Sequence, residues 1–404
     1  MYDVVVIGGG WAGINAAITA SNLGLKTALV EKDKIGGLCL NYGCIPTKVY
    51  FQSAKLIHQI RKSKEFGINT KDFSINFSDI FKRKEKIIEN IAQGLKYQLK
   101  NIDLFYSNAE IKSCSEIIID GKILKTKNLI LATGSMPKEL NNLEFDGKKI
   151  LSSTDILNLE VLPKNLLIIG AGAIGCEFAW IFSNFGINVT LIEVKSYILP
   201  ELDIEISKKV GLEFKKIGID IITSCDFSKI NIDNFEKVLV TIGRMPNLDS
   251  DWLSFVKEPN IYLAGDVNGK LLLAHAASKE GKTCATNIYN LQNNIREESI
   301  NYNLIPNSIF VYPEIAAVGV TSGKAKTFSL KANGICNILG ETGGIIKLFI
   351  EDKTDKILGG VLYCPNAFEI VNILVTAINS NLDLNKFKKL AFTHPSVSES
   401  LLEV

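Results

Sequence analysis

Residues 4–31 read VVVIGGGWAGINAAITASNLGLKTALVE, and this stretch decides the expected fold. An apolar run predicts a buried strand, a helical pattern follows from Ile14 to Leu23, and a second apolar run ends in Glu31. Glycines in the first turn let a pyrophosphate approach the helix N-terminus, and the terminal acid accepts hydrogen bonds from a ribose. The stretch therefore predicts a Rossmann-like domain, whose turn carries three suitably spaced glycines: Gly8, Gly10 and Gly13.

The same pattern recurs at residues 166–193, which read LLIIGAGAIGCEFAWIFSNFGINVTLIE. Its glycines are Gly170, Gly172 and Gly175, and its acid is Glu193. In both copies the acid lies 18 positions after the third glycine. A single fingerprint of this kind is weak evidence, but two copies in the correct strand–turn–helix context predict two bound dinucleotides.

Two further buried strands are expected to end at ligand clefts. One covers residues 128–132 and leads into residues 133–135, and the other covers residues 261–264 and leads into Asp266. In open α/β sheets, ligands bind at the carboxyl ends of the strands.

The pattern changes after about residue 300. Residues 345–350 and 357–362 predict a hairpin, and helices are expected over residues 367–379 and 384–390. The expected fold class is therefore α/β, with two Rossmann-like dinucleotide-binding domains and a C-terminal α+β domain.

A cysteine pair follows the first fingerprint, in residues 36–48, GGLCLNYGCIPTK. Pro46 favours the first turn of a helix, so Cys44 should lie at or just before a helix N-terminus. There the helix dipole and Lys48, one turn further on, would favour a thiolate and lower its pKa. Beside a dinucleotide site, Cys39 and Cys44 fit a pair that passes two electrons between a cofactor and a disulfide.

The alternatives for this pair are a structural disulfide, half of a zinc site or two buried thiols. A zinc site needs two more ligands, and the sequence has no second paired Cys/His cluster, so no metal is expected. The other six cysteines are scattered and fit small buried side chains in a reducing compartment.

The overall composition is that of an ordinary globular protein. The net charge of +2 predicts neither nucleic-acid nor membrane binding, and basic runs such as Lys82-Arg83-Lys84 are expected to be solvated helix faces. No signal peptide precedes the first strand, so a cytoplasmic location is expected.

The chain resembles the class I pyridine nucleotide–disulfide oxidoreductases over essentially its whole length, and most closely the members that oxidise dihydrolipoamide. The resemblance rests on both fingerprints with their acids, on the cysteine segment, and on further stretches in the family's order: residues 132–135, 241–247, 263–267, 273–281, 312–321 and 394–399.

The resemblance implies FAD at the first fingerprint and NAD at the second. Glu31 would bind the adenosine ribose of FAD, and Asp266 would bind its ribityl part. The residues implied for FAD are Gly8, Gly10, Gly13, Glu31, Gly37, Lys48, Thr133, Gly134, Ser135, Asp266 and Ala274. Those implied for NAD are Gly170, Gly172, Gly175, Glu193 and Gly243.

It also implies the catalytic roles. Cys44 would be the charge-transfer thiol next to the flavin, and Cys39 would exchange with the substrate. Lys48 would pair with Glu177 near the nicotinamide. A general base, oriented by a carboxylate, would come from the other subunit of a homodimer; these two residues are His394 and Glu399.

The implied division of the chain is a FAD domain in two parts, residues 1–150 and 246–300, an NAD domain at 151–245 and an interface domain at 301–404. The implied partners are lipoyl domains of 2-oxo acid dehydrogenase or glycine cleavage complexes.

Two other functions stay open. Related NAD(P)H-dependent reductases of glutathione or another small disulfide share these motifs, although NADPH enzymes need positive charge where this chain has Glu193. A non-catalytic paralogue that serves as a scaffold is the second alternative. The chain also departs from the family pattern, with Leu38 in place of a threonine, Ser396 after His-Pro, and shortened β structure at residues 107–126 and 221–238.

Overall fold

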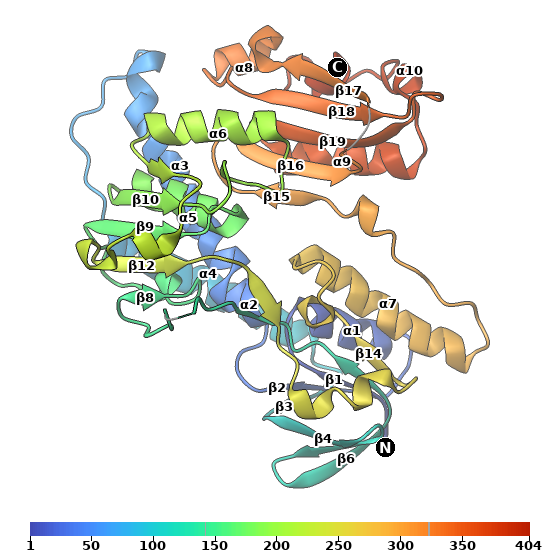
Figure 1. The fold of residues 1–404 in the computed structure, drawn as a ribbon. Helices are drawn as coiled ribbons and strands as arrows, with labels where there is room; N and C mark the ends of the chain where they lie inside the picture. The colour runs from blue at the N-terminus through green and yellow to red at the C-terminus, as the bar shows by residue number, and fades with distance from the viewer. Residues whose placement is uncertain (142, 322–323) are drawn as a thin grey trace. The chain divides into compact units, whose positions relative to one another are not determined.

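The computed structural model describes residues 1–141, 143–321 and 324–404 (Figure 1). The chain forms two compact units, each built from three segments. Unit 1 contains residues 1–47, 81–138 and 243–300, and unit 2 contains residues 48–80, 139–242 and 301–404.

Unit 1 is built on a mixed sheet. Its strands β3, β2, β1, β6 and β14 run parallel in that order, and β5 and β4 extend β6 as an antiparallel meander. The central strand β1 is fully buried from Val4 to Val6, as expected for a parallel strand that is covered on both faces. The bounds are β1 Tyr2–Ile7, β2 Thr27–Glu31, β3 Asp103–Tyr106, β4 Ala109–Ser113, β5 Glu116–Ile119, β6 Lys122–Leu131 and β14 Ile261–Leu263.

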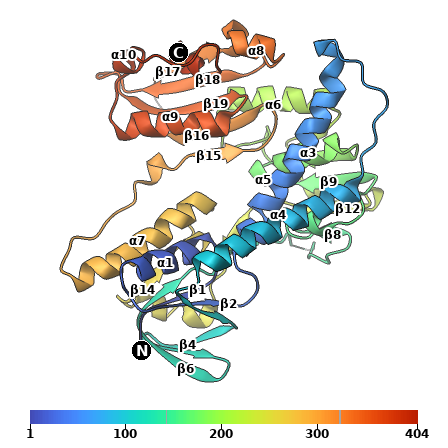
Figure 2. The same ribbon diagram turned by 180° about the vertical axis from the view of Figure 1, so that it is seen from behind.

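Two helices of unit 1, α1 (Trp11–Asn22) and α7 (Ala274–Gln292), lie side by side in both views (Figures 1 and 2). A Cβ added at Gly281 of α7 would lie 2.0 Å from the carbonyl oxygen of Ala12. Glycine is therefore required for this close helix contact. Helix α4 (Phe77–Gln98) and the short strand pair β7 (Ser135–Pro137) and β13 (Arg244–Pro246) complete the elements used below.

Unit 2 contains a parallel sheet with the order β11-β10-β9-β12-β8. The residues between β11 and β12, 223–236, are all described and contain two short 3-10 turns and no strand, in agreement with the shortened β structure seen in the sequence. The bounds are β8 Ile150–Leu151, β9 Asn165–Ile169, β10 Asn188–Ile192, β11 Asp220–Ile222, β12 Lys237–Val240, α3 Cys44–Lys62, α5 Ala173–Asn184 and α6 Ile204–Lys216.

Unit 2 also contains an antiparallel sheet with the order β15-β16-β19-β18-β17. The predicted hairpin and the predicted helix over residues 367–379 are confirmed. The bounds are β15 Asn307–Ile309, β16 Glu314–Gly319, β17 Lys324–Ser329, β18 Ile345–Ile350, β19 Ile357–Cys364, α8 Gly334–Ile338, α9 Ala367–Asn379 and α10 Leu384–Phe387.

Helix α10 is shorter than the prediction of residues 384–390. After Lys388 the backbone changes to bonds between residues three apart, since Lys389 donates to Lys386 and Leu390 donates to Phe387, both at 3.1 Å. This tightening ends the α-helix and satisfies its last carbonyl groups.

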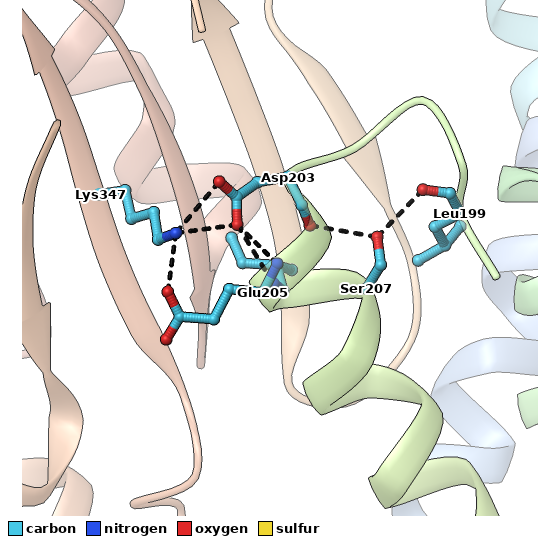
Figure 3. Close-up of polar contacts among 6 residues, drawn as sticks. Leu199, Asp203, Glu205, Ser207 and Lys347 are labelled. Carbon is cyan, nitrogen blue, oxygen red and sulfur yellow. Dashed lines mark hydrogen bonds and ion pairs between the residues drawn. The ribbon is translucent and has the colours of Figure 1, made fainter. Parts of the chain in front are cut away.

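One polar cluster joins α6 to strand β18 (Figure 3). Lys347 of β18 pairs with Asp203 at 2.9 Å and with Glu205 at 2.7 Å. Burial alone would lower the pKa of Lys347, but hydrogen bonds to Glu205 and Asp203 raise it above its usual value. The Asp203 carboxylate also caps α6 by accepting the N–H groups of Glu205 and Ile206.

The prediction that Lys82-Arg83-Lys84 is a solvated helix face is wrong for one residue. Lys82 and Arg83 are exposed, but Lys84 is only 1% exposed. Its ammonium lies 3.9 Å from the ring centroid of Phe81 and pairs with Glu85 at 2.7 Å. Successive helix positions point about 100° apart, so a run of like charges need not share one face.

Three of the scattered cysteines are buried as predicted, namely Cys176, Cys336 and Cys364, whereas Cys114, Cys225 and Cys284 are partly exposed. Within the described residues, no helix combines the length and the apolarity needed to cross a membrane.

Candidate functional site

The first fingerprint forms the expected tight turn between β1 and α1. Gly8 has φ +105°, and a Cβ there would lie 2.3 Å from the carbonyl oxygen of Ala132. A Cβ at Gly13 would lie 1.8 Å from the Gly8 carbonyl oxygen. At Gly10, which is the N-cap of α1, a Cβ would meet nothing within 4 Å. The middle glycine therefore faces open space at a helix N-terminus, where a pyrophosphate fits.

The second fingerprint repeats this arrangement between β9 and α5. A Cβ at Gly170 would lie 2.7 Å from the Thr241 carbonyl oxygen, and one at Gly175 would lie 2.0 Å from that of Gly170. Gly172 is the N-cap of α5 and again faces open space. Both loops therefore fit a dinucleotide for the same geometric reasons.

The two fingerprint acids are held alike. Glu31 accepts N–H groups of Gly9 at 2.5 Å and of Asp33 at 2.7 Å. Glu193 accepts N–H groups of Ala171 at 2.8 Å and of Lys195 at 2.9 Å. Both side chains are more than nine-tenths buried. Each carboxylate is thus oriented by its own glycine loop.

The cysteine segment is hydrogen-bonded to the loop of the first fingerprint, so the two cysteines follow directly after the expected dinucleotide site. The Gly36 N–H donates to the Gly9 carbonyl oxygen at 2.8 Å, and a Cβ at Gly37 would lie 2.8 Å from Cα of Gly10. Cys39 lies in the short helix α2 (Gly37–Tyr42). Cys44 is the first residue of α3, so the prediction that it stands at a helix N-terminus is confirmed.

A polar cluster in unit 1 is formed by residues that follow the carboxyl ends of strands β6 and β14. Ser135 donates to Asp266 at 2.5 Å, and its hydroxyl accepts the Nε–H of Arg244 at 2.8 Å. Thr133 donates to the Asn247 carbonyl oxygen at 2.5 Å. The predicted residues 133–135 and 266 are therefore brought together. Gly243, expected with the second fingerprint, lies in unit 1, where its carbonyl oxygen accepts the N–H of residue 138.

Two members of this region were not singled out from the sequence. Arg244 interacts electrostatically with Asp266 and with Cys44, while burial lowers the pKa of its guanidinium. Glu280 of α7 accepts the N–H of Gly265 at 2.6 Å and is 3% exposed. Both lie in stretches of sequence on which the family resemblance rests, and that resemblance is the signal that could have identified them. Ala274 is the first residue of α7.

Unit 2 contains a clamp around Glu177. Lys48 of α3 donates to both carboxylate oxygens of Glu177 of α5, at 3.1 and 2.9 Å. The Phe310 N–H donates to the same carboxylate at 2.9 Å, and the Phe310 ring lies under the Lys48 ammonium, 4.3 Å from Nζ to the centroid. The expected Lys48–Glu177 pair is present. Phe310 was missed because a main-chain donor leaves no mark in the sequence.

The tail of unit 2 contains the second expected pair. His394 Nδ1 lies 2.8 Å from Glu399 Oε1, and the other Glu399 oxygen accepts the Ser396 N–H at 2.6 Å. A hydrogen bond from the Ser396 N–H, which has the larger effect, and one with the His394 side chain lower the pKa of Glu399 below its usual value. The His394 side chain is 82% exposed in the single chain. An ionised carboxylate thus orients an accessible imidazole.

The predicted residues are divided between the units. Unit 1 holds both cysteines, the first fingerprint and the cluster around Asp266, and unit 2 holds the second fingerprint, the Glu177 clamp and the tail pair. Among the side chains of the described residues, no group of three or more His, Cys, Asp or Glu is placed to hold a metal ion.

The chain matches the family described as pyridine nucleotide-disulphide oxidoreductase over residues 2–281, and its dimerisation domain over residues 305–404. The dihydrolipoyl dehydrogenase of Chlamydia pneumoniae is 36% identical over 443 aligned residues, which cover 98% of this chain and 95% of that protein. A dihydrolipoyl dehydrogenase from Bacillus subtilis strain 168 is 34% identical over 464 aligned residues, which cover 100% of this chain and 97% of that protein. Both alignments exceed the 404 residues of this chain, so they place gaps in it.

Solved structures with the same fold include the HOCl-induced flavoprotein disulfide reductase RclA from Escherichia coli. It has a TM-score of 0.86 and 25% identity, with 100% of this chain and 99% of that chain covered. LpdA from Mycobacterium tuberculosis has a TM-score of 0.87 and 23% identity, with 99% and 98% covered.

Proposed function

Because the chain belongs to the pyridine nucleotide-disulphide oxidoreductase family, we propose that it is a dihydrolipoyl dehydrogenase, which reoxidises protein-bound dihydrolipoyl groups with NAD. Members of this family are flavoprotein disulfide oxidoreductases that use FAD and NAD. The full-length relatives that carry the proposed name support this activity.

The first fingerprint holds FAD in this proposal. Its loop has the open space at Gly10 that a pyrophosphate needs, Glu31 receives the ribose, and Asp266 with residues 133–135 receives the ribityl side. Bound FAD supplies a two-electron acceptor and bound NAD supplies the final hydride acceptor.

Cys39 and Cys44 form the redox disulfide. A substrate thiolate attacks Cys39 Sγ and displaces Cys44 as a thiolate, which forms a mixed disulfide. The second substrate thiolate then displaces Cys39, so the substrate leaves as a disulfide and the cysteines keep two electrons. His394, as general base, takes the proton of the attacking thiol, and Glu399 stabilises the resulting imidazolium.

The choice of NAD rests on Glu193, and this observation carries the proposal. Its buried carboxylate accepts the N–H of Ala171 in the second fingerprint and the N–H of Lys195 just after it, at the position that meets the adenosine ribose. A 2′-phosphate at that position would face a negative charge instead of the positive charge that NADPH enzymes need.

Glu193→Arg is therefore expected to weaken NAD and to improve NADP relative to it. Loss of a charge-assisted hydrogen bond costs about 1.5–3 kcal/mol, or roughly ten- to a hundred-fold in affinity. Initial rates across concentrations of both nucleotides measure the change in kcat/KM. Lys229→Gln, at an exposed 3-10 turn of the same unit, is the control. A wild-type protein that uses NADP as well as NAD contradicts the assignment.

Phe310→Leu is expected to lower kcat by about 2- to 30-fold while the Lys48–Glu177 pair stays in place. The variant keeps the N–H that binds Glu177 but removes the ring under Lys48, and a cation–π contact contributes about 0.5–2 kcal/mol. Phe368, whose ring stacks on Phe310 at 5.1 Å, offers the control Phe368→Leu. Equal losses in kcat from both variants would show that packing, and not the cation–π contact, matters.

A steady-state assay tests the proposed activity. Purified protein should reduce NAD with dihydrolipoamide faster than it oxidises NADPH with glutathione disulfide. The reverse preference would favour a small-disulfide reductase, the second candidate, which the similarity in fold to RclA supports. A protein that purifies without flavin absorbance would instead favour a scaffold.

The remaining proposals follow from the family. The FAD domain takes residues 1–150 and 246–300, the NAD domain 151–245 and the interface domain 301–404. The matched dimerisation domain supports a homodimer. Lipoyl domains of 2-oxo acid dehydrogenase or glycine cleavage complexes are the proposed partners, and the cytoplasm is the proposed location.

A further inference from the structure

Unit 2 contains a cavity of about 890 Å³ that is separate from the fingerprint glycines. It is lined by the last turns of α3, by α5, by the end of α6 and by residues 340–343. Its size is in the range of sites for small molecules, about 300–1,000 Å³. The proposed reaction uses none of its side chains.

The inner wall of the cavity is aromatic. Trp180, Phe214 and Tyr363 line it and are each 1% exposed, so their rings are held by the core. His58 and Tyr312 extend this wall, since the His58 ring lies 5.9 Å from Trp180 and 5.6 Å from Tyr312. Burial, with a further contribution from a nearby lysine, lowers the pKa of His58 to about 4. The half-buried rings of His58 and Tyr312 are therefore the faces of this wall that a ligand can reach, and both are uncharged at neutral pH.

Two carboxylates in the cavity already have cations. Lys62 pairs with Glu341 at 3.2 Å, and Lys216 pairs with Glu213 at 2.7 Å. Burial raises the pKa of Glu341 above its usual value, while Lys62 opposes that rise. Each ion pair is neutral overall, so these four side chains add little net charge to the cavity.

The remaining charged side chains give the cavity a positive excess. Among the described residues, Arg61 and Lys331 line the cavity with no carboxylate within ion-pair distance, and Glu65 is the carboxylate left over on the wall. The Arg61 and Lys331 side chains are both exposed in the single chain, so an incoming anion can reach them. An oxyanion would supply the missing partner.

We propose that this cavity binds a small aromatic oxyanion, with its ring against His58 and Tyr312 and its carboxylate or phosphate toward Arg61 and Lys331. The ring gains burial and stacking, and the acid group gains charge-assisted hydrogen bonds. The site does not depend on the proposed dehydrogenase activity, because no residue assigned to that chemistry lines it.

The test is a calorimetric titration of the full-length, FAD-loaded protein with saturating NAD, so that the nucleotide sites are filled. Phenyl phosphate and benzoate, which separate the two acid groups, are the probes. Benzylamine reverses the charge, and inorganic phosphate lacks the ring. At least one aromatic anion should bind saturably and at least tenfold more tightly than benzylamine and inorganic phosphate.

Variants locate the binding. Arg61→Gln and Lys331→Gln should each weaken the aromatic anion about tenfold, and Arg61→Lys should recover most of the loss. Lys64→Gln, an exposed neighbour outside the cavity wall, is the matched control and should change nothing. The proposal is overturned if neither aromatic anion binds, if benzylamine binds as tightly, or if Lys64→Gln weakens binding as much as Arg61→Gln.

Discussion

Cys44→Ser and Cys39→Ser are each expected to abolish turnover of dihydrolipoamide while differing in absorbance. Cys39→Ser should show a long-wavelength charge-transfer band without added reductant, and Cys44→Ser should lack it under all conditions. The band requires a thiolate beside oxidised flavin. Cys44 begins α3, interacts electrostatically with Arg244, and is followed one turn later by Lys48, so cations and the helix dipole favour its thiolate.

Visible absorbance spectra and initial rates, on proteins with equal flavin content, measure both effects. Cys225→Ser provides the matched control, because this partly exposed cysteine lies outside the redox segment and should keep full turnover. If Cys39→Ser lacks the band and Cys44→Ser shows it, the two thiols have the opposite roles.

His394→Gln is expected to lower kcat by roughly 10²–10⁴-fold, the usual contribution of a general base. A dihydrolipoyl thiol with a pKa of about 8.5 is mostly protonated at neutral pH, so its attack on Cys39 needs a base. Glu399→Gln should cause a smaller loss, because it removes the charge that orients His394 and leaves the imidazole present. Flavin content and thermal stability should be unchanged in both variants.

Subunit mixing tests whether the base comes from the partner chain. Cys44→Ser and His394→Gln homodimers should both be inactive. A heterodimer of the two should regain one intact site, with Cys44 from one chain and His394 from the other, as an isologous dimer predicts. Mixtures that contain demonstrated heterodimers and stay inactive would rule out a shared site.

Much of this fold could be predicted because glycine and proline restrict or permit particular backbone conformations, and these residues mark the turns and helix starts. The glycines of both fingerprints are needed where a Cβ would meet a carbonyl oxygen, so their spacing predicts the strand, turn and helix around them. Pro46 likewise predicted the start of a helix at Cys44. The His394–Glu399 contact is local and depends on a spacing of five residues.

The sequence was less informative where function depends on the backbone or on tertiary placement. Phe310 orients Glu177 through its N–H, which every residue except proline has. Arg244 interacts electrostatically with Cys44, although the two residues are 200 positions apart in the chain. Lys84 is buried by tertiary packing, which a run of basic residues in the sequence does not indicate. The aromatic cavity gathers side chains from separate elements, and no spacing rule connects them.

The cluster around Asp203 has a thermodynamic consequence. One carboxylate caps α6 and also binds Lys347 of β18, so the first turn of α6 can unfold only by breaking an ion pair to the antiparallel sheet. Helix α6 and strand β18 should therefore exchange their slowest amide hydrogens with the same opening free energy, as parts of one foldon. Asp203→Ala should separate them, with the residues of β18 and those of α6 becoming unequally protected.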